Sequence, residues 1–139
     1  MQMSTVFEVP IPPDRVAVYL GDPRNLGIAN HEGPVVDRSE GPVATGSWFV
    51  LAFGQLRARV DYVQYDPQEI VAKVAVTGRG SGGIVATHAF RLSPLDGGEA
   101  TRVEASIDGT GGLITWEPAM RAAQRLTWRR IRQRMEKTA

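Results

Sequence analysis

Two histidines are the side chains of this sequence best suited to proton transfer or metal binding. His31 and His88 stand far apart, no cysteine is present, and no His-x-x-x-His pair occurs. Zinc sites draw on clustered His and Cys ligands, so this pattern predicts neither a metal site nor any other cofactor. An imidazole, with an ordinary pKa of about 6.5, can still serve as an acid, a base or a polar anchor.

His88 lies in an alternating segment that predicts a β-strand. Its period-2 face is otherwise apolar and consists of Ile84, Ala86, Phe90 and Leu92. We expect this face to border an apolar cavity, where a neutral imidazole would orient a ligand oxygen or transfer protons. A hydrogen-bonded structural histidine is the alternative. Tyr62, in an alternating segment over residues 55–65, is the second catalytic candidate, and His31 is either a pocket-mouth or a solvent residue.

Residues 78–83 match the dinucleotide fingerprint G-x-G-x-x-G. Pyrophosphate binding by that fingerprint requires a helix directly after the glycines. Residues 84–90 instead alternate and include β-branched side chains, which predicts a strand. We therefore interpret the glycines as a hairpin loop that could cover a pocket.

The carboxylates of the strands give no acid–base pair. Asp61, Glu104 and Asp108 fall on faces opposite the apolar sets, where we expect cross-strand pairs with Arg57, Arg59 or Arg102. The Gly-x-Ser-x-Gly nucleophile elbow is absent as well.

The elements around these residues follow from the same patterning. Alternation predicts about seven strands, six of them consecutive with hairpin-length links, which favours an antiparallel sheet. Pro12-Pro13-Asp14 predicts the start of a short helix that ends near Leu20. A second short helix is predicted over residues 23–29 and a long amphipathic helix over 113–137. The fold class is therefore α+β.

Composition indicates one domain over residues 1–139. The hydrophobic fraction is 42%, and 16 basic residues face 15 acidic ones, which gives no overall charge for nucleic-acid binding. The first residues lack a secretory signal, and no apolar run approaches the roughly 18 residues of a membrane span. We expect a cytoplasmic protein without stable membrane insertion.

A single helix across a wide curved sheet leaves an apolar pocket between them. Small alanines at the middle of the predicted C-terminal helix favour that pocket. The residues predicted to line it are Leu26, Phe49, Leu51, Val60, Tyr62, Val74, His88, Phe90, Trp116, Met120, Ala123 and Thr127.

Three stretches of the chain resemble a known superfamily. They are residues 7–26 (FEVPIPPDRVAVYLGDPRNL), 60–67 (VDYVQYDP) and 87–103 (THAFRLSPLDGGEATRV). They resemble the SRPBCC (START-like, helix-grip) superfamily, and within it the polyketide cyclase/dehydrase group. The resemblance implies a curved antiparallel sheet wrapped around a long C-terminal helix, and binding of apolar or amphipathic small molecules beneath that helix. The tryptophan that many relatives carry near residues 27–31 is missing here.

Three functions remain open at this point. The first is reversible binding of a small hydrophobic or amphipathic ligand. The second is a metal-free cyclase/dehydratase-type lyase that uses His88 and Tyr62 in the same cavity. The third is a protein-interaction module, with a homodimer as one form, because Trp48, Val50 and Ala52 are predicted to form an apolar patch on the outer face.

The Ala123→Trp substitution tests the predicted cavity. An indole at the middle of the C-terminal helix would fill the space, so uptake of an environment-sensitive apolar dye should be lost while the circular dichroism spectrum is unchanged. Unchanged dye binding in the folded variant would argue against a pocket under this helix.

Overall fold

The computed structural model describes residues 2–26, 34–80 and 82–110, together with 129, 132–133 and 136–137. Most of this part of the chain is β-structure, with one α-helix and a 3-10 turn between the first two strands and a second 3-10 turn between the last two. The elements are β1 (Gln2–Val9), α1 (Pro13–Leu20), η1 (Pro23–Asn25), β2 (Val35–Arg38), β3 (Trp48–Phe53), β4 (Leu56–Tyr65), β5 (Glu69–Thr77), β6 (Val85–Leu95), η2 (Asp96–Gly98) and β7 (Ala100–Thr110).

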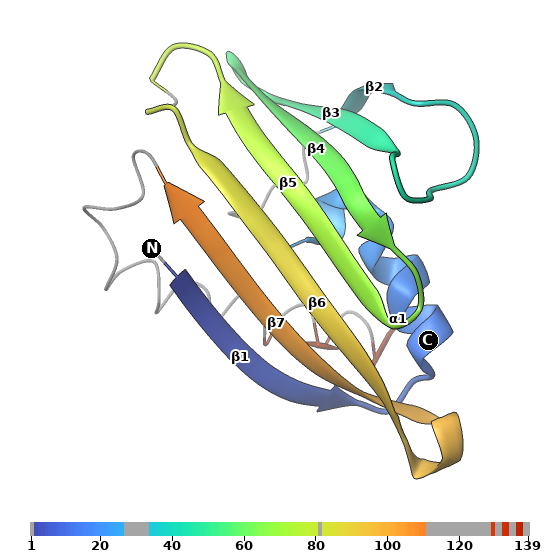
Figure 1. Ribbon diagram of the computed structural model, residues 1–139. Helices are drawn as coiled ribbons and strands as arrows, with labels where there is room; N and C mark the ends of the chain where they lie inside the picture. The colour runs from blue at the N-terminus through green and yellow to red at the C-terminus, as the bar shows by residue number, and fades with distance from the viewer. Residues whose placement is uncertain are drawn as a thin grey trace.

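The strands form one antiparallel sheet in the order β1-β7-β6-β5-β4-β3-β2. This confirms the predicted seven-stranded antiparallel sheet. The sheet is curved, and α1 lies behind it in the view of Figure 1, which defines an inner face. The predicted helix over 113–137 falls mostly outside the described residues, although the five described positions from 129 onward are helical. The full length of that helix stays a prediction.

The alternation of apolar residues correctly predicts which side of each strand faces the core. Val60, Val74, Val103 and Ile107 are buried on the inner face, and Phe7 is half-buried beside them. Apart from His88, which pairs with Ile107, their cross-strand partners are apolar. Period-2 patterning on neighbouring strands thus builds one large buried cluster and a smaller one of Met3, Ala86 and Ile107. The Asp96-Gly97-Gly98 signal forms the predicted link between β6 and β7.

The second predicted helix is described only over its first residues. A 3-10 turn spans Pro23–Asn25 and is capped by Leu26, and residues 27–29 lie outside the described part of the chain. The Asp22 side chain accepts a hydrogen bond from the Arg24 backbone N–H at 3.0 Å, and Pro23 occupies the first position. Both features are typical of the start of a helix. They add little stability to an element this short, because the first turn of a helix is unfavourable and only later turns offset its cost. His31 lies outside the described residues.

A bulge in β4 changes the direction of the side chains near its end. The pairing with β5 shifts between Tyr62 and Gln64, so strict alternation fails and both Tyr62 and Tyr65 pair with inner-face positions. The Tyr62 hydroxyl donates to the Leu20 carbonyl oxygen at 2.7 Å, and the Tyr65 hydroxyl donates to the Ala17 carbonyl oxygen at 2.7 Å. Two tyrosines of one strand thus attach the C-terminal end of α1 to the sheet.

The outer face is polar, but its ion pairs differ from the predicted ones. Arg59 pairs with Asp61 and Arg102 with Glu104, in each case along one strand. Side chains two apart on a strand share a face, so this geometry competes directly with cross-strand pairing. The expected cross-strand arrangement is therefore corrected for these two pairs.

Trp48 faces outward, as predicted, and is half-buried. The Arg59 guanidinium lies 4.8 Å from the centre of its indole ring. An arginine that stacks on an aromatic ring also covers it with its aliphatic stem. The predicted apolar patch is therefore partly covered by a charged side chain.

We expect Tyr62→Phe to lower the free energy of unfolding by about 1–3 kcal/mol, because it leaves the buried Leu20 carbonyl without its tyrosine partner. Tyr65→Phe is the matched control. The Ala17 carbonyl also accepts a hydrogen bond from the Gly21 N–H, so Tyr65→Phe should lower the free energy of unfolding by less, about 0.5–1.5 kcal/mol. Urea denaturation of both variants measures the difference. Equal losses would contradict this ranking.

Candidate functional site

His88 lies at the centre of the inner face. It pairs with Ala72 on β5 and Ile107 on β7, and the same cross-strand row continues to Tyr62 on one side and Met3 on the other. The imidazole is fully buried, and neither Nδ1 nor Nε2 hydrogen-bonds to any residue in the described part of the chain. The sequence analysis correctly places this side chain on the apolar face.

Burial lowers the pKa of His88 to about 4. The ring is therefore neutral at pH 7, with one nitrogen as donor and the other as acceptor. A buried polar group without a partner costs about 1–3 kcal/mol, so such groups are rare in folded proteins. The unpaired imidazole is consequently the clearest polar recognition group on the inner face.

Tyr62, the second catalytic candidate, is arranged differently. Its hydroxyl hydrogen is donated to the Leu20 carbonyl, and its ring packs edge-on against Phe49 and Tyr65. Burial, with smaller contributions from Asp22 and Tyr65, raises its pKa far above the usual range. It stands two strands away from His88, a backbone separation of about 10 Å. These features favour a role in holding α1.

The structure brings the other predicted lining residues of the sheet together. Leu26, at the end of η1, joins one buried cluster with residues from β3 to β6. The predicted members of this cluster are Leu26, Phe49, Leu51, Val60, Tyr62, Val74 and Phe90. Trp116, Met120, Ala123 and Thr127 lie outside the described residues, so their side of the cavity stays a prediction.

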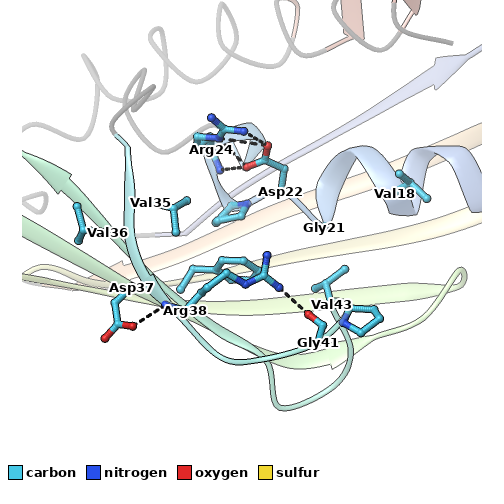
Figure 2. A pocket seen from close by; sticks show the side chains of 13 residues that line it. Val18, Gly21, Asp22, Arg24, Val35, Val36, Asp37, Arg38, Gly41 and Val43 are labelled. Carbon is cyan, nitrogen blue, oxygen red and sulfur yellow. Dashed lines mark hydrogen bonds and ion pairs between the residues drawn. The ribbon is translucent and has the colours of Figure 1, made fainter.

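The structure contains a concave feature that was not predicted. An open groove of about 790 Å³ runs between the α1–η1 junction and β2 with the loop that follows it. Figure 2 shows Asp22 and Arg24 on one wall and Arg38 across from them. Sequence reasoning passed over this region because β2 is short and weakly patterned. An apolar pair followed by a charged pair, Val35-Val36-Asp37-Arg38, was the available signal.

Ion pairing divides the charged groups of this groove into two kinds. Arg24 binds both oxygens of Asp22, with its Nη2 at 2.7 Å from Oδ2. Burial raises the pKa of Asp22, but the hydrogen bonds and charge of Arg24 outweigh it, so the pKa lies below its usual value. Arg38 makes no ion pair with a described residue and bonds instead to two backbone carbonyls.

In the described ranges, no three His, Asp or Glu side chains gather closely enough to hold a metal ion. None of the helices there is long and apolar enough to cross a bilayer.

A curved seven-stranded antiparallel sheet with α1 on its inner face is the arrangement of strands expected for the helix-grip class of fold. The family described as "Polyketide cyclase / dehydrase and lipid transport" matches residues 1–136, and the chain belongs to it. This confirms the resemblance to the SRPBCC superfamily. No curated protein matches the chain in sequence.

Several solved structures share the fold. Protein CV1439 from Chromobacterium violaceum is 16% identical, with 97% of this chain and 96% of that chain covered and a TM-score of 0.68. Ara h 8.0201 is 13% identical, with 97% of both chains covered and a TM-score of 0.61. DynU16, a protein of the dynemicin biosynthetic locus, is 20% identical, with a TM-score of 0.60. The match covers 98% of this chain but 46% of DynU16.

The neutral state of His88 predicts a dependence of stability on pH. The pKa of His88 is about 4 in the folded protein, against 6.5 for an exposed imidazole, so the unfolded state binds the proton more readily between these two pH values. The stability that comes from keeping this imidazole neutral is fully present above pH 6.5 and is lost as the pH falls toward 4. Urea denaturation at pH 7 and 4.5 should show a loss of roughly 2–3 kcal/mol from this group.

The control is His88→Gln, which cannot titrate, so other groups cancel in the comparison. An identical pH dependence in both proteins would show that the ring is not held neutral by burial.

Proposed function

We propose that this protein reversibly binds a small hydrophobic or amphipathic ligand on the inner face of the sheet, beneath the predicted C-terminal helix. The observation that carries the proposal is the unpaired, fully buried imidazole of His88 among apolar side chains. A ligand oxygen beside it would supply the missing partner. The membership of the chain in a family that includes lipid-transport proteins supports the same function.

The surroundings of His88 indicate the chemistry of the ligand. The cross-strand neighbours Ala72 and Ile107, and Phe90 two residues further along β6, present only carbon atoms from their side chains. A neutral ring pairs with a carbonyl or hydroxyl without burying a charge. The preferred ligand therefore has an apolar body and one hydrogen-bonding oxygen near its middle or end. We place this activity in the cytoplasm.

A cyclase/dehydratase-type reaction is the second candidate. The description of the family and the biosynthetic setting of DynU16 favour it. Acid–base catalysis of this kind requires at least two groups that converge on the substrate, one to remove a proton and one to donate it. The Tyr62 hydroxyl proton is already given to Leu20, which leaves His88 as the one titratable group offered on this row. Binding is therefore the better supported function.

An interaction module built on Trp48 has less support, because Arg59 lies over its ring and itself pairs with Asp61. Native mass spectrometry of freshly purified protein, followed by extraction of the bound molecule, distinguishes ligand binding from the interaction module. A co-purified apolar compound supports binding. A ligand-free dimer would favour the interaction module instead.

Substitution of His88 tests the anchor directly, with Nile red, a neutral dye that carries a carbonyl oxygen, as the probe. His88→Gln keeps a donor and an acceptor, so its Kd should change less than about threefold. His88→Ala leaves the dye oxygen unpaired, which should weaken binding roughly 5- to 100-fold. Fluorescence titration measures both.

Thr101→Val provides the matched control. Thr101 is as buried as His88, but its hydroxyl donates to the Ile11 carbonyl at 2.7 Å. Loss of this hydroxyl should lower the free energy of unfolding and leave the Kd for Nile red unchanged. If His88→Ala binds the dye as tightly as the parent protein, His88 is not the anchor.

A further inference from the structure

The groove beside β2 contains an arginine, Arg38, that is held in place without an acidic partner among the described residues. The Arg38 guanidinium lies 4.7 Å from the centre of the Phe49 ring. Its Nε donates to the Ser39 carbonyl at 3.0 Å and its Nη2 to the Gly41 carbonyl at 2.7 Å. Two hydrogen bonds and one ring contact therefore fix a side chain that would otherwise be flexible, which lowers the entropy cost of any further bond.

Register explains why Asp37, the neighbouring carboxylate, does not neutralise this charge. Asp37 pairs with outward-facing Val50, whereas Arg38 pairs with inward-facing Phe49. Figure 2 shows the two side chains leaving β2 in different directions. Asp37 instead accepts the backbone N–H of Arg38 at 2.9 Å. The other carboxylate on the groove, Asp22, is already paired with Arg24.

The Arg38 guanidinium therefore has N–H donors that no described residue uses. A guanidinium carries five N–H donors in a planar fork. Two of its nitrogens bond to carbonyls, and no described residue bonds to Nη1. A carboxylate is the group that matches the geometry of two parallel N–H donors and also neutralises the charge.

The remaining walls of the groove are apolar and partly open. Val18 on α1 is 73% exposed and Val36 on β2 is 53% exposed, although both are valines. Val35 and Val43 extend this surface between them. Apolar side chains around a fixed cation suit a molecule with a hydrocarbon body and an anionic end. The volume of about 790 Å³ lies within the range of small-molecule sites.

We propose that this groove is a binding site for a small carboxylic acid with an alkyl or aryl body, its carboxylate on Arg38 and its body against the valines. The site is separate from His88, because Arg38 lies at the β2 edge of the sheet while His88 lies on a central strand. The proposal therefore does not depend on the function proposed for the inner face.

Nuclear magnetic resonance with three probes of equal chain length tests the charge requirement. Octanoate, 1-octanol and octylammonium are titrated into the full chain with labelled valine methyl groups. Octanoate should shift the methyl signals of Val18, Val35, Val36 and Val43, whereas the alcohol should bind at least about tenfold more weakly and the cation more weakly still.

Two substitutions test the role of Arg38. Arg38→Gln removes the charge and should weaken octanoate binding about tenfold or more, while the affinity for 1-octanol stays the same. Arg57→Gln is the matched control. Arg57 also bonds to two backbone carbonyls, those of Gly54 and Leu56, but it pairs with outer-face Ala52, so octanoate binding should not change.

Two results would overturn the proposal. One is equal binding of octanoate and 1-octanol at these valines, which would make the charge irrelevant. The other is octanoate binding that shifts Val74 and Val103 on the inner face and leaves the groove valines unaffected. The second result would agree with the function proposed for His88, so the two proposals can fail independently.

Discussion

The hydrogen bonds from Tyr62 and Tyr65 to the end of α1 are the constraint on which the rest of the architecture depends. An α-helix leaves its last carbonyls without intrahelical partners. In α1 no basic side chain occupies the last turn, and these carbonyls are satisfied from elsewhere. Tyr62 and Tyr65 bond to Leu20 and Ala17, and the Asn25 amide donates to the Tyr19 carbonyl at 2.9 Å. The helix end is thereby tied to β4 and to η1 together.

This attachment also explains why a glycine follows α1. A Cβ at Gly21 would lie 2.6 Å from the Tyr65 hydroxyl oxygen and 2.9 Å from a methyl group of Val43. The backbone of Gly21 is right-handed, so close approach rather than a left-handed conformation requires glycine here. Tyr65, Gly21 and Val43 meet at the point where the helix, β4 and the loop before β3 converge. The same point forms one end of the groove that contains Arg38.

The sequence predicts those features that depend on local periodicity and misses those that depend on contacts between distant segments. Val60, Val74 and His88 could be placed on the inner face because successive side chains of a pleated strand point to opposite faces of the sheet. Tyr65 could not, because the bulge between Tyr62 and Gln64 reverses the phase and is stabilised by bonds to a helix more than forty residues away. The groove was missed for a related reason. Its walls come from α1, η1 and β2, and no short pattern specifies how they meet.

His88 and Thr101 are both buried polar residues, but they differ in whether their polar atoms have a hydrogen-bond partner. Both are completely inaccessible, and both lie on the inner side of the sheet. Thr101 donates to the Ile11 carbonyl and so connects β7 to the segment before α1, which accounts for its presence in structural terms. His88 makes no such connection within the described residues, and burial keeps it neutral. A leucine at that position would pack with Ile107 and Phe90 and avoid the cost of desolvating two nitrogens. In the proposed function a bound molecule supplies the missing partner of His88, and the free energy of that hydrogen bond then appears in the affinity for the ligand.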